Sequence, residues 1–182
     1  NETGILQQIS NKYYANIEES DPFDLKRFHQ RIKTRLPKYQ QAIMYESYKY
    51  GLDWKLVAAV IYQESHFNPK AKSFTNVRGL MQVTAATAQE MGIENRLNPR
   101  QSIQAGIKYL NKMVRKFDFI EDEYEQLLFG LASYNVGYGH VKDAMEIARS
   151  LGLDDTRWQN VKTTLPLISK SKYYKKTKYG YA

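Results

Sequence analysis

The chain has 182 residues, of which 42% are hydrophobic and 25% are charged. These values are typical of a soluble globular protein, and the length suits one domain with a sizeable core. No run approaches the roughly 20 apolar residues of a membrane-spanning helix. The absence of cysteine excludes disulfides and cysteine-based zinc sites, and the net charge of +8 favours an anionic partner.

The positive charge is dispersed along the chain rather than gathered on one helix face. One cluster lies near the C-terminus, at Lys170, Lys172, Lys175, Lys176 and Lys178. No predicted helix combines a basic face with base-reading side chains, so we expect no nucleic-acid partner. The fifteen Tyr and two Trp residues fit either of two roles: they bind sugars or peptides, or they fill the core and its rim.

The first twenty residues differ from the rest of the chain. Residues 5–17 predict a short amphipathic helix, and residues 18–22 (EESDP) predict a break. We therefore expect residues 1–20 to be the tail of an upstream domain or a linker, and residues 21–182 to form one domain.

From Phe23 onward the pattern predicts one helix after another. Pro37 ends the first helix and can begin the second, which Gly51 closes. Helical spacing of apolar residues then recurs in five further stretches: residues 53–67, 84–91, 101–117, 124–134 and 141–148.

Caps and breaks complete this pattern. We expect Thr84 to cap a short helix that Gly92 stops, and we expect Gly137 and Gly139 to break the helix before them. Residues 158–168 are ambiguous, and residues 170–182 predict a loop because they have no apolar periodicity. The fold class is therefore mainly α, a multi-helix domain with at most a minor β turn around residues 66–82.

One ionisable residue, Glu64, lies on an otherwise apolar helix stripe. It follows Val57, Val60 and Ile61 at positions i, i+3, i+4 and i+7, between a capping Asp53 and Pro69. Burial and the C-terminal end of the helix dipole both raise the pKa of such a carboxyl, which favours a proton donor near neutral pH. The alternative is a Glu at the helix rim whose carboxylate points to solvent.

No second carboxylate follows Glu64 in the next loop, since the next acid is Glu90 on a separate predicted helix. Glycoside hydrolysis usually takes two carboxylates that flank the sugar. One acid alone fits a reaction in which the substrate supplies its own nucleophile, although an Asp from elsewhere in the chain could complete a pair.

Other chemistries have little support in the sequence. The three histidines are far apart and lack metal-ligand spacing, so we expect no metal site. No nucleophile elbow, phosphate-binding loop or dinucleotide fingerprint is present, so we expect no cofactor.

Three ordered motifs resemble those of the family 1 lytic transglycosylases, which have a soluble-transglycosylase domain and a goose-lysozyme-like fold. The resemblance spans about residues 38–165. The motifs are Glu64-Ser65 with Asn68-Pro69 and Ser73, then GLMQ at residues 79–82, then ASYN at residues 132–135 with Gly137.

The resemblance implies one catalytic residue, Glu64, as acid and then base. It implies six substrate-binding residues: Ser65, Ser73, Met81, Gln82, Tyr134 and Asn135. In this family the two Ser hydroxyls orient the acid and the sugar, Met and Gln line the cleft, Tyr lies against the carboxyl group and Asn binds sugar. Thr75 stands where the family often has a second Ser, and it keeps a hydroxyl.

Five of the six substrate-binding residues also have a purely structural alternative. Ser65 could cap the helix end, Met81 could fill the core, Gln82 could be solvated, and Tyr134 and Asn135 could be core and cap residues. Two functional alternatives also stay open. One is a goose-type lysozyme that hydrolyses the same bond, and the other is a peptidoglycan-binding module with little activity.

The resemblance further implies substrate, partner and location. The substrate would be peptidoglycan, cut between N-acetylmuramic acid and N-acetylglucosamine with formation of a 1,6-anhydro end. A solute-binding-like regulatory domain would precede this one, and the protein would be periplasmic and outer-membrane-associated in a Gram-negative bacterium. The family continues into a further helix, so we expect the domain to be truncated at its C-terminus.

Overall fold

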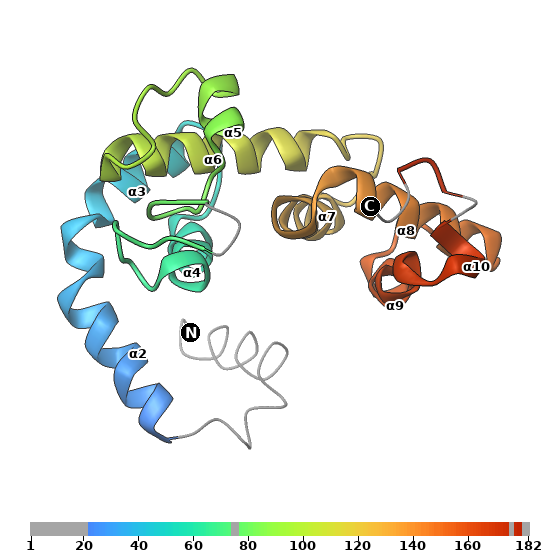
Figure 1. The fold of residues 1–182 in the computed structure, drawn as a ribbon, viewed down its shortest axis with the longest axis horizontal. Coiled ribbons are helices and arrows are strands. Elements are labelled where there is room, and N and C mark those ends of the chain that lie inside the picture. The colour runs from blue at the N-terminus through green and yellow to red at the C-terminus, as the bar shows by residue number, and fades with distance from the viewer. Residues whose placement is uncertain (1–21, 74–76, 175–176, 180–182) are drawn as a thin grey trace.

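The structure is a computed structural model that describes residues 22–73, 77–174 and 177–179 (Figure 1). Helices follow one another through this part of the chain. Their order is α2 (Pro22–Thr34), η2 (Leu36–Lys38), α3 (Gln40–Tyr48), α4 (Trp54–Ser65), α5 (Ala85–Glu90), α6 (Pro99–Arg115), α7 (Glu123–Val136), α8 (Tyr138–Ser150), α9 (Trp158–Thr164), η3 (Leu165–Ser169) and α10 (Ser171–Tyr174).

The predicted mainly-α class is confirmed. Only two isolated antiparallel bridges occur among the residues named above, Lys72 with Arg78 and Arg78 with Val83, at the predicted β turn. The predicted helix at residues 5–17 lies outside the described residues. No described helix is long and apolar enough to cross a membrane.

Side-chain caps begin the helices where the sequence predicts them. The Asp53 carboxylate accepts a hydrogen bond from the Lys55 N–H at 2.9 Å, and the Thr84 hydroxyl accepts one from Thr87 at the same distance. Such caps satisfy backbone N–H groups that have no partner within the helix. The Asn98 cap, followed by Pro99, starts α6 slightly earlier than the apolar pattern predicts.

Three boundary predictions were wrong. Gly139 lies inside α8, because Gly137 alone, at φ +94°, ends α7. Pro37 is the second residue of the 3₁₀ turn η2, and the following α-helix starts only at Gln40. The segment predicted as a C-terminal loop contains the short helix α10, which partly buries Tyr173 against a neighbouring apolar cluster.

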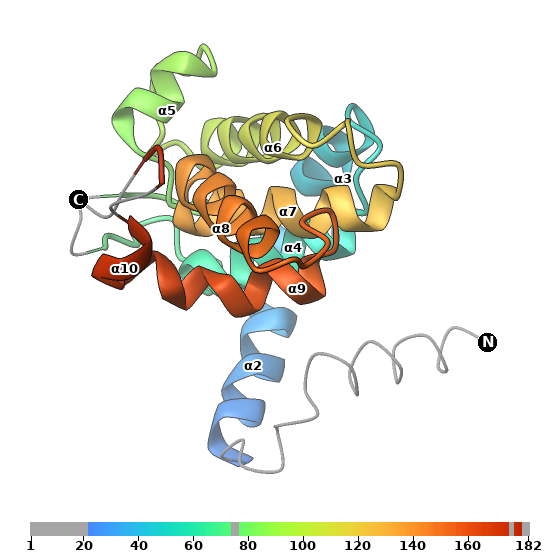
Figure 2. The same ribbon diagram turned by 90° about the vertical axis from the view of Figure 1, so that its right-hand side faces the viewer.

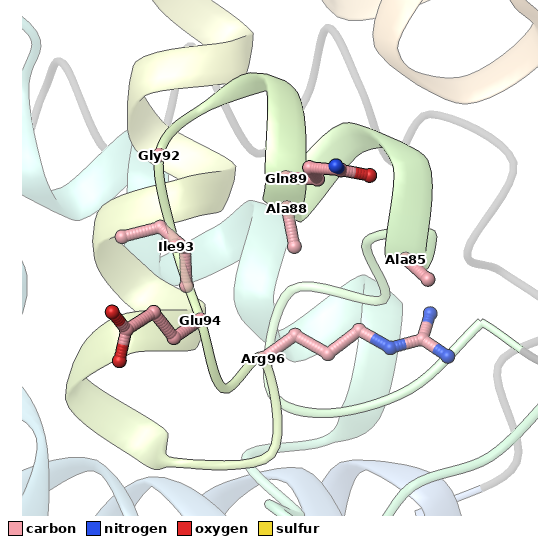
Figure 3. Close-up of a pocket in the computed structure, with 7 residues that line it drawn as sticks. All are labelled: Ala85, Ala88, Gln89, Gly92, Ile93, Glu94 and Arg96. Carbon is pink, nitrogen blue, oxygen red and sulfur yellow. The ribbon is translucent and has the colours of Figure 1, made fainter.

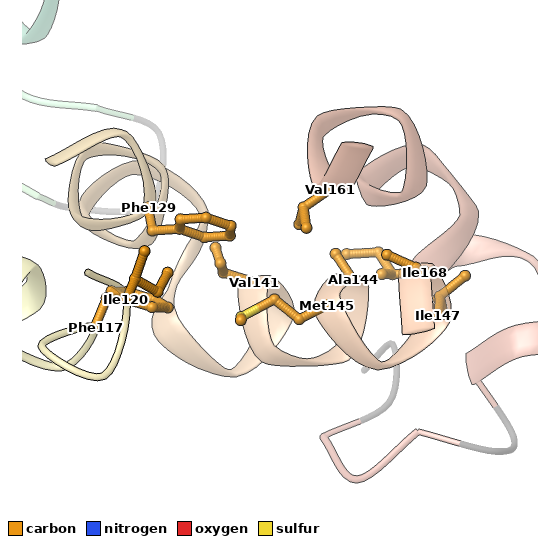
Figure 4. Close-up of a cluster of buried hydrophobic side chains, with 10 residues drawn as sticks. Phe117, Ile120, Phe129, Val141, Ala144, Met145, Ile147, Val161 and Ile168 are labelled. Carbon is orange, nitrogen blue, oxygen red and sulfur yellow. The ribbon is translucent and has the colours of Figure 1, made fainter. Parts of the chain in front are cut away.

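Two large apolar clusters hold the helices together. One lies under α3, α4 and α6, with Ile43, Val57 and Ile61 fully buried. The other lies between α7, α8 and α9 and is rich in aromatic rings (Figure 4). In both ribbon views α2 projects from the helical body, and α5 stands above α6, which leads into the α7–α10 half (Figures 1 and 2).

Candidate active site

Glu64 lies in the last turn of α4 and is half-buried. Val57 and Ile61, on the same stripe, are fully buried. Burial raises the pKa of the Glu64 carboxyl above its ordinary value, as the sequence predicts. Within the described part of the chain no side-chain hydrogen bond or ion pair to Glu64 occurs to oppose this shift.

The chain turns sharply after Ser65. His66 and Phe67 both have left-handed backbone conformations, with φ of 53° and 57°, which bulky residues rarely adopt. Phe67 is 1% exposed, and its burial in the cluster under α4 offsets this strain. The turn brings the following loop back alongside α4.

The turn at residues 79–82 requires Gly79. Its φ is +86°, and a Cβ added there would lie 2.6 Å from the Arg96 carbonyl oxygen and 2.8 Å from the Ser102 hydroxyl. Any other residue would therefore clash and would also be strained by the backbone conformation. The position permits the loop to pass directly against the start of α6.

Polar groups from three helices hold this turn. The Ser65 hydroxyl of α4 donates to the Leu80 carbonyl at 2.8 Å, and the Tyr134 hydroxyl of α7 donates to the Met81 carbonyl at 2.6 Å. The Ser102 hydroxyl of α6 accepts from the Met81 N–H at 3.3 Å. Buried backbone groups need such partners, so the three side chains fix the conformation of the turn.

Gln82 completes the turn. Its amide nitrogen donates to the Gly79 carbonyl at 2.8 Å and to the Ala71 carbonyl at 3.2 Å, and its own φ is 45°. These two bonds join both ends of the loop and orient the Gln82 side chain at the edge of an open space beside Glu64.

That space is a cavity of about 360 Å³, within the usual range of about 300–1,000 Å³ for ligand sites. It lies between α4, the loop at residues 77–84, α5, α6 and the end of α7. Its lining consists of Glu64, Val77, Gln82, Val83, Thr84, Thr87, Tyr109, Ser133, Tyr134, Asn135, Val136 and Gly137. Glu64 is the one carboxylic acid among these described lining residues.

Two tyrosines form an aromatic wall of the cavity. The ring centroids of Tyr109 and Tyr134 lie 5.6 Å apart at an interplanar angle of 55°. Burial, the negative charge of Glu64 and the nearby Tyr109 hold the pKa of the Tyr134 hydroxyl well above its ordinary value. Tyr134 is therefore a neutral phenol beside Glu64, and its proton is directed to the Met81 carbonyl.

Four of the seven predicted site residues meet at the cavity: Glu64, Gln82, Tyr134 and Asn135. Three others lie elsewhere. Ser65 is buried and bonds to the loop, and the Ser73 hydroxyl accepts from the Val77 N–H at 3.2 Å. Thr75 lies outside the described residues.

The prediction that the Met81 side chain lines the cleft was wrong. It is fully buried and packs so closely on α6 that a Cβ at Gly106 would overlap it. Met81 is linked to the site by its main-chain carbonyl, which accepts a hydrogen bond from the cavity-lining Tyr134, and not by its thioether. The alternation of directions in the turn puts Gln82 on the cavity side and Met81 in the core.

Several lining residues were not predicted from the sequence, and Tyr109 is the largest of them. It lies on α6, where one Tyr in a long amphipathic helix has no spacing that marks it. Thr84 was identified only as a cap, and both it and Thr87 also line the cavity. A signal that could have pointed to them is their place directly after the 79–82 motif.

A second cavity, of about 500 Å³, lies on another face of α5 (Figure 3). It contains none of the predicted site residues. Arg96, one of its lining residues, donates to the Val83 carbonyl at 2.7 Å and so supports the loop that borders the first cavity.

A helical domain with one half-buried acid at a helix end, facing an open cavity, has the features of a lysozyme-like domain. The solved structure of an inactive variant of lytic transglycosylase Slt from Pseudomonas aeruginosa matches 75% of this chain and 25% of its own, with a TM-score of 0.54 and 24% identity. That likeness shows the fold.

The family follows from the sequence comparisons. The model of the transglycosylase SLT domain matches residues 41–155, more than half of the chain. The chain belongs to this family, which confirms the resemblance predicted from the motifs. Two relatives are both named membrane-bound lytic murein transglycosylase F. The one from Desulfosudis oleivorans is 51% identical over 181 residues, and the one from Shewanella pealeana is 49% identical over 180.

The alignments cover 100% and 99% of this chain but 40% and 37% of the two relatives. The chain therefore spans about two fifths of the length of the relatives it matches.

Proposed function

We propose that the chain is a peptidoglycan lytic transglycosylase, which cleaves the bond between N-acetylmuramic acid and N-acetylglucosamine and leaves a 1,6-anhydromuramic acid end. The observation that carries the proposal is Glu64, a raised-pKa acid and the only carboxylic acid among the described residues of the cavity lining. Hydrolysis with two carboxylates requires a partner about 5–9.5 Å away across the sugar. Family membership and the names of the relatives agree with this proposal.

The reaction has two proton transfers, both at Glu64. First the protonated carboxyl donates its proton to the glycosidic oxygen, and the bond from that oxygen to the muramic acid C1 breaks with its electron pair on the oxygen. The Glu64 carboxylate then takes the proton of the C6 hydroxyl as that oxygen bonds to C1. The anhydro ring closes, Glu64 regains its proton, and no water is consumed.

The surroundings of Glu64 suit both steps. Burial keeps the carboxyl protonated at a pH where an exposed Glu would be ionised. The Tyr134 hydroxyl stays neutral beside Glu64, so it adds no second negative charge to the site, and its oxygen keeps lone pairs that can accept a hydrogen bond. Both N–H groups of the Gln82 amide are bound to loop carbonyls, so its amide oxygen is left as an acceptor at the cavity. The Asn135 amide provides both donors and an acceptor for sugar hydroxyl and acetamido groups.

The role proposed for the other three predicted residues, Ser65, Ser73 and Met81, is indirect. Ser65 and the Met81 carbonyl hold the loop that presents Gln82, and Ser73 holds the base of the same loop. We assign substrate contact to Gln82, Tyr134 and Asn135, and loop positioning to the other three.

The partner, location and domain proposals rest on the resemblance and on the relatives. A net charge of +8 suits the anionic peptide stems and wall polymers of peptidoglycan. We place the protein in the periplasm, associated with the outer membrane, in keeping with relatives that are named membrane-bound. We assign residues 21–182 to the catalytic domain and residues 1–20 to the tail of an upstream domain or to a linker, and we propose that the upstream domain is a solute-binding-like regulatory domain.

The test is digestion of purified sacculi, followed by mass analysis of the soluble products. Anhydro ends, lighter than hydrolysed ends by the mass of one water, are the expected product. Hydrolysed ends alone would contradict the mechanism and favour a goose-type lysozyme. Glu64→Gln is the matched control, because it keeps the shape of the side chain and removes the proton donor.

Binding is measured beside cleavage, by pelleting the protein with sacculi. If the wild type and Glu64→Gln both bind and neither cleaves, the chain is a peptidoglycan-binding module and the enzyme proposal fails.

A further inference from the structure

A second carboxylate, Asp143, is 1% exposed on α8, away from the cavity lining. Charged side chains are rarely buried unless they are paired, because burial removes their hydration. One oxygen of Asp143, Oδ1, accepts a hydrogen bond from the Tyr179 main-chain N–H at 3.2 Å. The other, Oδ2, is buried and has no hydrogen-bond partner within the part of the chain that the structure describes.

The contact with Tyr179 links segments far apart in the sequence. After α10 the chain returns, and residues 177–179 lie beside α8 in both ribbon views (Figures 1 and 2). Tyr179 approaches α8 at Gly139, one turn before Asp143. A Cβ at Gly139 would lie 2.8 Å from Tyr179 Cγ, so the absence of a side chain there permits the contact.

This contact adjoins the cavity. Gly137 lines it and caps the start of α8, two residues before Gly139. Tyr179 also lies close enough to Tyr138 to raise the pKa of that hydroxyl, after the larger effect of burial. Tyr179 therefore packs on the first turn of α8, which follows the cavity-lining residues 135–137 in the chain.

We propose that Asp143 is a positioning residue: it docks residues 177–179 on the first turn of α8 and so holds the 135–137 wall in its substrate-binding position. The inference rests on the proposed function for the identity of the substrate. A protein with a buried carboxylate that has one unpartnered oxygen is less stable than the same protein with an apolar residue of similar shape at that position. Its presence beside a glycine that admits Tyr179 fits a docking role better than a packing role.

The first readout is the docking itself. The chain has no cysteine, so Lys178→Cys, at an exposed position, provides one attachment point for a spin label in the full chain. The label should be restricted in the parent protein and mobile in Asp143→Leu and in Gly139→Ala. Asp143→Asn keeps an acceptor oxygen for the Tyr179 N–H and should leave the label restricted.

Gly139→Ala separates docking from stability. Ala is favoured over Gly inside a helix, and the φ of Gly139 is not positive. We expect this variant to fold and melt at or above the parent temperature even though it displaces Tyr179. It also keeps the inference testable if Asp143→Leu fails to fold.

The second readout is binding to sacculi in the Glu64→Gln background, which does not depend on catalysis. Gly139→Ala and Asp143→Leu should weaken binding about tenfold, equivalent to about 1.4 kcal/mol. Glu146→Gln, an exposed carboxylate on the same helix, is the matched control and should change neither readout.

The outcomes are distinct. A label that stays restricted in both variants overturns the docking, and a mobile label with unchanged binding overturns the positioning role while the proposed function stands. If the parent itself neither binds nor cleaves sacculi, the proposed function fails, and the substrate-binding part of this inference fails with it.

Discussion

The two sides of the cavity are held in different ways. On the Glu64 side the backbone is irregular, with left-handed residues at 66, 67 and 82, and hydrogen bonds from Ser65, Ser102 and Tyr134 fix the turn. On the α7–α9 side the helices are regular, and apolar contacts hold them (Figure 4). Phe129 stacks on Phe117 at 5.1 Å there.

The difference indicates that the Glu64 side carries the reactive groups and that the α7–α9 side supports them. The irregular backbone on the Glu64 side brings the Glu64 carboxyl, the Gln82 amide and the carbonyls of the 79–82 turn close together. A single continuous helix could not bring these groups together. The helical side supplies a rigid wall at the end of α7. Tyr134 joins the two sides, because it projects from α7 and donates to the Met81 carbonyl in the loop.

The largest expected effect is on the chemical side. Glu64→Gln should lower the rate of sacculus cleavage by about 10²–10⁴-fold, the usual contribution of a general acid–base group. Folding should be retained, because the carboxyl makes no hydrogen bond within the described residues. Cleavage rate and thermal melting are measured together, and a variant that cleaves at the wild-type rate would contradict the assignment.

The next effect falls on the supporting side. Phe129→Ala should lower the free energy of unfolding by about 3–5 kcal/mol, because it opens a hole between the Phe117 and Trp158 rings. Urea unfolding measures the change. Under conditions where the variant is folded, its pH profile of cleavage should match the wild type. A shifted pH profile would show that packing on the α7–α9 side also affects the chemistry at Glu64.

A smaller effect is expected from Ser65→Ala. The change removes the donor to the buried Leu80 carbonyl and should cost about 1–3 kcal/mol of stability. Since the same bond holds the loop that carries Gln82, the cleavage rate should also fall. Ser150→Ala, at a hydroxyl that bonds within α8 far from the loop, is the control. Equal losses of activity in both variants would refute the loop-holding role of Ser65.

The smallest effect is on the pH dependence of stability. A carboxyl whose pKa is raised in the folded state binds more protons there than in the unfolded chain, whose Glu pKa is about 4.3. The favourable contribution of protonated Glu64 is complete below that unfolded pKa and is lost as pH rises through the folded pKa. Glu64→Gln should therefore gain stability relative to the wild type over this window. A stability difference that does not change with pH would contradict the raised pKa.

Local features of this molecule were predictable from sequence because their causes are local. Asp53 and Thr84 cap helices through residues two or three positions away, and Gly92 ends a helix through its own φ of +75°. The raised pKa of Glu64 followed from its place on an apolar stripe. These features required no knowledge of which segments meet in space.

The features that were missed depend on tertiary contacts. The Ser65 hydroxyl bonds to a carbonyl 15 residues away, and Tyr134 bonds to one 53 residues away, so neither role has a signal in local spacing. Gly139 was predicted to break a helix because glycine is a poor helix former. The contact that favours glycine at this position is with Tyr179, which is distant in sequence. Met81 and Gln82 belong to the same motif, yet only the turn geometry decides which side chain faces the cavity.

The most direct test of the account is the titration of Glu64 itself, by NMR of a protein with carbon-13 in its Glu carboxyl groups. Comparison with Glu64→Gln identifies the Glu64 resonance. We expect a midpoint above the ordinary Glu value of about 4.3, together with loss of cleavage activity as this group deprotonates. A midpoint at or below the ordinary value would contradict Glu64 as the proton donor of this cavity.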